Sequence, residues 1–167
     1  MKFRPANLAD VPDIILLIEQ GKEYFRKLKI EQWQFQYPNS ESIEKDIFDK
    51  TGYLLEETKI IAYVSASFLP EEHYHAIRGK WLSGEHDNFC TLHRLAIDNN
   101  KKGSGVAATL LSQIEHICNE KDVKNIRVDT HNDNNSMRRF LEKNGFTLCG
   151  IIINTIGEER LAYEKIL

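Results

Sequence analysis

Residues 89–130 read FCTLHRLAIDNNKKGSGVAATLLSQIEHICNEKDVKNIRVDT, and this stretch decides the fold. The apolar run from Phe89 to Ile97 predicts a buried strand. Apolar residues recur at the helical period from Gly103 to Lys121, and alternation from Lys124 to Thr130 predicts a second strand. A strand, a helix and a strand joined by a short return form a βαβ crossover, so the two strands are expected to be parallel.

The chain before this stretch predicts two helices and a hairpin. A cap-like Asn7 and Asp10 precede a helix that runs to about Lys29, with an apolar face made by Val11, Ile14, Ile15 and Ile18. A second helix is expected over Ser40 to Lys50, with Ile43, Ile47 and Phe48 turned inward. The segments Gly52–Glu57 and Lys59–Leu69 predict a tight hairpin, and Pro70 to Asn88 has no clear period and predicts an irregular connection.

The chain after this stretch predicts a helix and a strand pair. The helix covers Asn134 to Asn144 and ends at Gly145, and the strands Thr147–Ile153 and Glu159–Leu167 are expected to be antiparallel. The sum is an α/β fold, a mixed sheet with helices on both faces. The 167 residues suit a single domain, and no linker or repeat divides them.

Composition excludes several classes of protein. The 22 Lys and Arg residues against 25 Asp and Glu residues give a net charge of −3, which argues against a general nucleic-acid binder. No run approaches the roughly 20 apolar residues that span a bilayer, so no membrane association is expected. Cys90, Cys118 and Cys149 lie far apart and predict buried free thiols in a reducing, cytoplasmic setting.

The turn from strand to helix carries the first functional signal, in the residues Lys102, Gly103, Ser104, Gly105, Val106 and Ala107. Glycines at such a turn let backbone N–H groups converge, and the helix N-terminus and Lys101 add positive charge. This combination predicts a pyrophosphate cradle. The third glycine of a dinucleotide fingerprint and the Gly-Lys-Ser/Thr of a P-loop are missing. A glycine-softened helix start is the structural alternative.

These residues resemble the Arg/Gln-x-x-Gly-x-Gly/Ala acetyl-CoA motif of the GNAT acetyltransferase superfamily, with Lys102, Gly105 and Ala107 at its three positions. Downstream, Asn134 through Gly145-Phe146 is similar to the Asn-x-x-Ala-x-x-x-Tyr-x-x-x-Gly-Phe helix of that family. The resemblance covers essentially the whole chain and is strongest over residues 89–146.

The resemblance implies a GNAT fold with splayed parallel strands and acetyl-CoA as co-substrate. It assigns residues 1–88 mainly to the acceptor side, 89–146 to acetyl-CoA binding and 147–167 to a C-terminal strand pair. Backbone groups of Leu95, Ala96 and Ile97, beside a bulge in the strand, would meet the pantetheine arm. The turn from Lys102 to Ala107 would bind the pyrophosphate, and Asn134 would bind pantetheine near its end.

The implied reaction is direct attack by a primary amine of a small molecule, or by an exposed amino group, on the thioester. Leu141 stands where many members carry a tyrosine acid, so a catalytically weak acyl-CoA-binding or sensing module is the alternative. The candidate bases are His131, Asp129 and His93, with Asp129 able to orient His131, and Tyr163 could replace the acid. Each residue also has a purely structural alternative. Asp129 and His131 could simply finish a strand, His93 could be a buried residue bonded to backbone, and Tyr163 could pack as an ordinary strand aromatic.

The acceptor side is expected to hold four aromatic residues, Trp33, Tyr37, Tyr74 and Trp81, each of which could equally be core. Arg94 is expected either to pair a buried carboxylate or to hold an acidic substrate group. His73 and His75 lack further ligands of useful spacing, so no metal site is predicted. The protein is expected to be a monomer or a homodimer.

Overall fold

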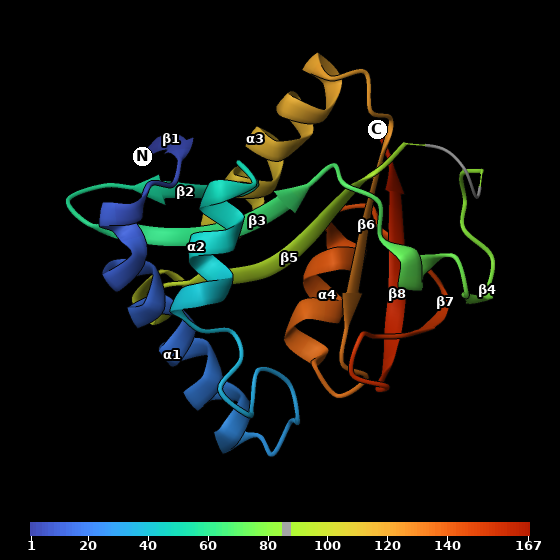
Figure 1. Cartoon of the computed structure of the whole chain (residues 1–167), viewed down its shortest axis with the longest axis horizontal. Coiled ribbons are helices and arrows are strands. Elements are labelled where there is room, and N and C mark those ends of the chain that lie inside the picture. The colour runs from blue at the N-terminus through green and yellow to red at the C-terminus, as the bar shows by residue number, and fades with distance from the viewer. Residues whose placement is uncertain (85–87) are drawn as a thin grey trace. The chain divides into compact units, whose positions relative to one another are not determined.

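The computed structural model of the chain describes residues 1–84 and 88–167, and its elements are labelled in Figure 1. Contacts divide the chain into two compact units. Unit 1 comprises Met1–Ser67 and Leu92–His116, and unit 2 comprises Phe68–Thr91 and Ile117–Leu167. The strand β5 (Cys90–Ile97) and the helix α3 (Val106–Glu120) each cross from one unit to the other.

Unit 1 contains the strands β1 (Lys2–Pro5), β2 (Gly52–Glu56) and β3 (Ile60–Ser67) and most of β5, in the order β1-β2-β3-β5. β1 pairs antiparallel with β2, and β2 pairs antiparallel with β3, which confirms the predicted hairpin. The helices α1 (Val11–Lys27) and α2 (Ser40–Phe48) lie together on one face of these strands (Figure 1).

The start of α1 follows the predicted cap. A short 3-10 helix η1 (Leu8–Asp10) precedes it, where the Asn7 side chain accepts from the backbone N–H of Ala9 and the Asp10 carboxylate accepts from that of Asn7. Arg4 binds both oxygens of Asp10, at 2.7 and 2.8 Å, and ties β1 to this cap. The pKa of Asp10 is lowered, chiefly by these bonds from Arg4.

The core of unit 1 follows the predicted apolar faces with one exception. Val11, Ile14 and Ile18 of α1 are buried in one cluster with Ile43, Leu17, Leu54, Ile60, Tyr63 and Ala96. Phe48 was expected to face inward with Ile43 and Ile47, but it is 85% exposed. It is the last residue of α2, and the inward positions of this short helix are already filled by Ile43, Ile47 and Asp46.

Unit 2 contains β6 (Asn125–Thr130), β8 (Glu159–Ile166), β7 (Thr147–Ile153) and the short β4 (Arg78–Gly79), in that order. The predicted antiparallel pairing of the last two long strands is confirmed. β4 and the 3-10 helix η2 (Glu72–Tyr74) lie inside the segment that was expected to be irregular throughout, and β4 pairs with Gly150 and Ile151 of β7. Residues 85–87 of that segment lie outside the described residues.

The helix α4 (Asn135–Lys143) lies wholly in unit 2. It ends shortly before Gly145, whose backbone has a φ of 85°. Cys90 and Cys118 are buried free thiols as predicted, whereas Cys149 in β7 is only half-buried. The predicted parallel pairing of the strands around α3 and the single-domain interpretation both concern the two units together, and they stay predictions.

A buried ion pair organises unit 2. Arg127 of β6 and Glu164 of β8 are cross-strand partners, joined from Nε to Oε1 at 2.9 Å, and their side chains are 1% and 0% exposed. The Arg127 guanidinium lies over the rings of Trp81 and Phe89, with its carbon at 4.2 and 4.1 Å from their centroids. The alternation of β6 therefore separates two buried faces rather than a core face and a solvated one.

Glu164 also anchors the segment that follows β4. Its carboxylate accepts from the backbone N–H groups of Leu82 and Ser83, the Ser83 hydroxyl and the Asn125 amide. Burial alone would raise the pKa of Glu164, but these hydrogen bonds and that of Arg127 outweigh it and the pKa is lowered. The ionised carboxylate therefore stabilises the fold.

The variant Glu164→Gln is expected to lower the free energy of unfolding by about 3 kcal/mol, because it leaves the Arg127 charge buried without a counter-ion. Denaturant unfolding measures the change. The double variant Glu164→Gln with Arg127→Met removes both charges and is the control, expected to recover part of the loss. Equal stability of wild type and Glu164→Gln would contradict a structural role for the charge.

The same carboxylate gives the stability a pH dependence. Its folded pKa lies below the ordinary value of 4.5, so its contribution is complete above pH 4.5 and is lost as the pH falls toward the lowered pKa. The Glu164→Gln variant is expected to lack this component of the acid unfolding of the wild type.

Candidate functional site

The predicted phosphate-binding turn lies in unit 1, between β5 and α3. After the 3-10 helix η3 (Asn99–Lys101), the backbone passes through left-handed conformations at Gly103 (φ 77°) and Gly105 (φ 88°). A Cβ added to either glycine would meet no atom within 4 Å, so the outer side of the turn is open. Thr109 donates to the carbonyl of Gly105, at 2.9 Å, and the first helical N–H groups before it have no acceptor inside α3.

The two lysines of this turn have protein partners. Lys101 forms an ion pair with Glu57, at 2.7 Å. The Lys102 ammonium lies 4.2 Å from the centroid of the Tyr24 ring, and burial lowers its pKa. The positive charge at the turn is therefore partly balanced by the protein, and the backbone N–H groups are its accessible donors.

The preceding strand β5 contains a left-handed residue that is not glycine. Arg94 has a φ of 55°, a conformation that costs an L-residue energy and breaks the alternation of a strand. It lies directly before Leu95, Ala96 and Ile97, whose backbone was expected to meet pantetheine beside a bulge. The preceding residue, His93, is half-buried. Its side chain or backbone has at least one polar, charged or ring contact with the rest of the protein.

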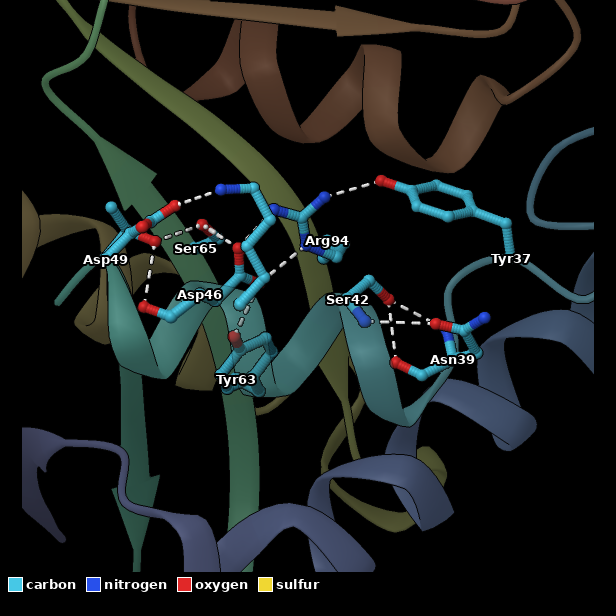
Figure 2. A network of polar contacts seen from close by, with 10 residues as sticks. Tyr37, Asn39, Ser42, Asp46, Asp49, Tyr63, Ser65 and Arg94 are labelled. Atoms are coloured by element: carbon cyan, nitrogen blue, oxygen red, sulfur yellow. Dashed lines mark hydrogen bonds and ion pairs between the residues drawn. The ribbon is translucent and has the colours of Figure 1, made fainter.

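Arg94 belongs to a network of polar contacts within unit 1, shown in Figure 2. Its Nε and Nη2 donate to the two carboxylate oxygens of Asp46 in α2, at 2.7 and 2.5 Å. Its Nη1 donates to the Tyr37 hydroxyl at 2.5 Å. Of the two expectations for Arg94, the pairing with a buried carboxylate is the one observed.

Asp46 is held by two further donors from β3. The Tyr63 hydroxyl donates to Oδ2 at 2.8 Å, and the Ser65 hydroxyl donates to Oδ1 at 3.0 Å. Burial raises the pKa of Tyr63 far above its ordinary value, and the Asp46 charge raises it further. Burial alone would lower the pKa of Arg94, but Asp46 outweighs it and the guanidinium stays charged.

The two aromatic residues predicted for the acceptor side of unit 1 lie on the segment between α1 and α2. Trp33 is half-buried and packs edge-on against Phe25, with ring centroids 5.4 Å apart. Tyr37 is 47% exposed and is held by Arg94. Both are thus fixed, and Tyr37 is the more accessible of the two.

In unit 2, Asp129 and His131 have different partners from those expected. Asp129 accepts from the Tyr74 hydroxyl at 2.7 Å. His131 follows the end of β6, and its Nδ1 accepts from the backbone N–H of Asp133 at 3.1 Å. The backbone of Asp133 thus orients the imidazole, and Tyr74 binds one oxygen of the Asp129 carboxylate, so the role of Asp129 in orienting His131 stays a prediction.

Tyr74 and Trp81 are core residues of unit 2, 1% and 4% exposed. They pack with Ile152 and Ala162, and the Trp81 indole donates to the Tyr74 carbonyl at 3.0 Å. Burial and the Asp129 charge hold the pKa of Tyr74 well above its ordinary value. These observations fit the core alternative, and a role in substrate binding remains a prediction.

The remaining predicted residues surround α4. Asn134 caps this helix, because its side chain accepts from the Met137 N–H at 3.2 Å while its amide donates to the Thr130 hydroxyl at 3.1 Å. Leu141 is fully buried. The Tyr163 side chain is also buried, with its hydroxyl 3.4 Å from Glu142.

Two acidic residues that organise these surroundings were not predicted, Asp46 and Glu164. Each had a signal in the sequence. Asp46 follows Ile43 by three residues and thus shares the inward face of its helix, and Glu164 follows Ala162 by two residues and shares the core face of its strand. A carboxylate at a core position implies a buried basic partner.

Within residues 1–84 and 88–167, no group of three or more His, Cys, Asp or Glu side chains could hold a metal ion. In the same part of the chain, no helix has the length and apolar character to cross a membrane.

The comparisons with known proteins agree with this geometry. The model of the Acetyltransferase (GNAT) family matches residues 19–146. A GNAT family acetyltransferase from Streptococcus agalactiae is 34% identical, with a TM-score of 0.89 over 99% of this chain and 95% of that one. The chain therefore belongs to the GNAT acetyltransferase family, and the predicted α/β GNAT fold is confirmed.

A more distant solved structure shares the fold, and one further protein matches part of the chain in sequence. PaiA N-acetyltransferase from Thermoplasma acidophilum, solved in complex with coenzyme A, is 17% identical, with a TM-score of 0.72 over 99% of this chain and 98% of that one. The Bacillus subtilis protein YxbD is 29% identical over 66 residues, which are 40% of this chain. The match spans 42% of the length of YxbD.

Proposed function

We propose that the protein is an N-acetyltransferase that transfers the acetyl group of acetyl-CoA to a primary amine of a small molecule or to an exposed amino group. Membership of the GNAT family supports the acetyl transfer. The observation that carries acetyl-CoA binding is the turn with two left-handed glycines, open on its outer side, directly before the N-terminus of α3. Such a turn suits a pyrophosphate, because backbone N–H groups and the helix dipole both favour an anion.

The chain supplies two further groups for acetyl-CoA in this proposal. The backbone of Leu95 to Ile97, turned by the left-handed Arg94, would bind the pantetheine arm and donate to the developing oxyanion. Asn134 is a secondary candidate, because its side chain already accepts from Met137 and donates to Thr130.

The reaction needs the amine to lose a proton before its nitrogen attacks the thioester carbon. The carbon–sulfur bond then breaks, and the thiolate leaves with the bonding electron pair and takes up a proton. A thiol with a pKa of about 8.5 is an acceptable leaving group without a strong acid. Catalysis is therefore compatible with Leu141 at the position of the usual tyrosine.

His131 is the first candidate for the base, and His93 is the second. A neutral imidazole that accepts at Nδ1 carries its hydrogen on Nε2. To accept a proton at Nε2, the His131 ring must move that hydrogen to Nδ1 and give up its bond from Asp133. The proposal therefore requires this bond to open when the amine is bound.

The acceptor and the setting also belong to the proposal. Two structural neighbours are ribosomal-protein alanine N-acetyltransferases, from Brucella melitensis and Escherichia coli, which illustrate a peptide amino group as acceptor. The proposal therefore includes an acceptor amine of this kind and a cytoplasmic setting for the reaction.

Calorimetry with acetyl-CoA and a thiol-release assay over a panel of amines test the function. Binding together with thiol release and a mass gain of one acetyl group on an amine supports the enzyme. Binding without turnover across the panel would favour the alternative, an acyl-CoA-sensing module, for which Leu141 is the motivating residue. Absence of acetyl-CoA binding would refute both.

The variant Gly105→Val is expected to weaken acetyl-CoA binding at least tenfold, because a branched side chain enters the open side of the turn and is strained at a positive φ. Gly157→Val is the matched control. Gly157 has a φ of 84° and equally open surroundings, but it lies in the β7–β8 turn. Calorimetry measures both affinities, and similar losses in the two variants would exclude a specific cradle at Gly105.

The variant His131→Ala is expected to reduce kcat about 100-fold, the scale of a general base, and to change acetyl-CoA affinity less than threefold. Steady-state kinetics and calorimetry measure the two quantities, with His93→Ala as the parallel variant. An unchanged kcat for His131→Ala at saturating substrates would remove it from the mechanism, and a loss in His93→Ala alone would transfer the role to His93.

A further inference from the structure

The backbone at position 94 is left-handed, a conformation usually adopted by glycine, but the residue there is an arginine. Residues with a Cβ rarely adopt a φ of 55°, because the Cβ approaches the following carbonyl oxygen. The contacts of the Arg94 side chain therefore have to compensate for this conformation. Only 13% of the side chain is exposed, so these contacts are largely sheltered from water.

Asp46 is a rigid anchor for that side chain. Its carboxylate receives four hydrogen bonds, two from Arg94, one from Tyr63 and one from Ser65. The donors come from β3 and β5, and Asp46 itself comes from α2, as Figure 2 shows. A planar guanidinium that binds both oxygens of a fixed carboxylate has a fixed orientation itself.

The third contact of Arg94 reaches the segment between α1 and α2. Nη1 donates to the Tyr37 hydroxyl, whose own hydrogen is therefore directed away from the guanidinium. Lys29, Trp33, Phe35 and Gln36 of this segment also have positive φ values. A segment with so many unfavourable backbone conformations depends on such a tether to keep its arrangement.

We infer that Arg94 is a positioning residue with two effects: its ion pair with Asp46 holds the left-handed turn of β5, and its bond to Tyr37 holds the segment 28–39. This inference rests on the proposed function, in which β5 meets acetyl-CoA and Tyr37 lies on the acceptor side. One guanidinium then fixes the backbone that binds the acyl donor and the segment that faces the amine.

A comparison of glycine with alanine at position 94 tests the first effect. In the background Asp46→Asn, which removes the buried charge, Arg94→Gly is expected to bind acetyl-CoA within about threefold of the wild type, because glycine adopts a positive φ without cost. Arg94→Ala in the same background is expected to bind about 5- to 25-fold more weakly than Arg94→Gly, the ratio that corresponds to the cost of a left-handed L-residue.

Calorimetry with acetyl-CoA gives the affinities, and circular dichroism and thermal unfolding verify that both proteins are folded. Equal affinities of the glycine and alanine variants would overturn the inference, because the turn would then hold without the ion pair. Should the Asp46→Asn background fail to fold, the same comparison is made with Asp46 retained. A wild-type protein that fails to bind acetyl-CoA refutes the proposed function instead.

Limited trypsin digestion tests the second effect without any ligand. Tyr37→Phe removes the acceptor of the Arg94 bond, and cleavage after Lys29 is expected to become at least threefold faster. Cleavage after the exposed Arg78, in unit 2, is the internal control and is expected to be unchanged. An unchanged rate at Lys29 would show that Arg94 does not hold this segment.

Discussion

The ion pair between Arg94 and Asp46 is the constraint on which the arrangement of unit 1 depends. It is bidentate and sheltered, and it joins α2 to β5 while two hydroxyl groups of β3 complete the carboxylate. Breaking one partner of such a pair leaves a buried charge without compensation, which is far more costly than the pair is favourable. The pair therefore holds α2 against β3 and β5 at a defined position.

Unit 2 uses the same physical device in a different element pair. Glu164 and Arg127 face each other across two antiparallel strands, and two aromatic rings pack against the guanidinium. In each unit an acidic residue gathers donors from segments that are distant in the sequence. Apolar burial supplies most of the driving force for folding, and these polar groups provide the directional contacts that align the segments.

Periodicity and turn chemistry were sufficient to predict most elements, because helices such as α1 and strands such as β7 express one local pattern. Phe48 was wrongly expected to be buried. The helical period shows which residues share a face of α2, but it does not show how far along that face the neighbouring elements extend. The short β4 was missed because its two residues pair with β7, and a ladder partner distant in the sequence leaves no local signal.

The candidate site also has features that the sequence could predict and features that it could not. The glycines at positions 103 and 105 were predictable, since their positive φ values follow from the turn that joins a strand to a helix. The partners of Asp129 and His131 were not, because alternation within β6 takes no account of Tyr74 or of the backbone of Asp133. Side-chain partners depend on tertiary contacts, which one sequence does not reveal.

The ion pair of Lys101 with Glu57 has a kinetic consequence for the proposed capture of a phosphate ligand, because it leaves Lys102 as the one lysine of the turn without a carboxylate partner among the described contacts. Long-range attraction depends on charge that is not balanced nearby, and the chain as a whole carries a net charge of −3. The backbone donors of the turn act only at short range. Association with a polyanion would then be limited by ordinary diffusional encounter and depend weakly on ionic strength, while selectivity would reside in the dissociation rate.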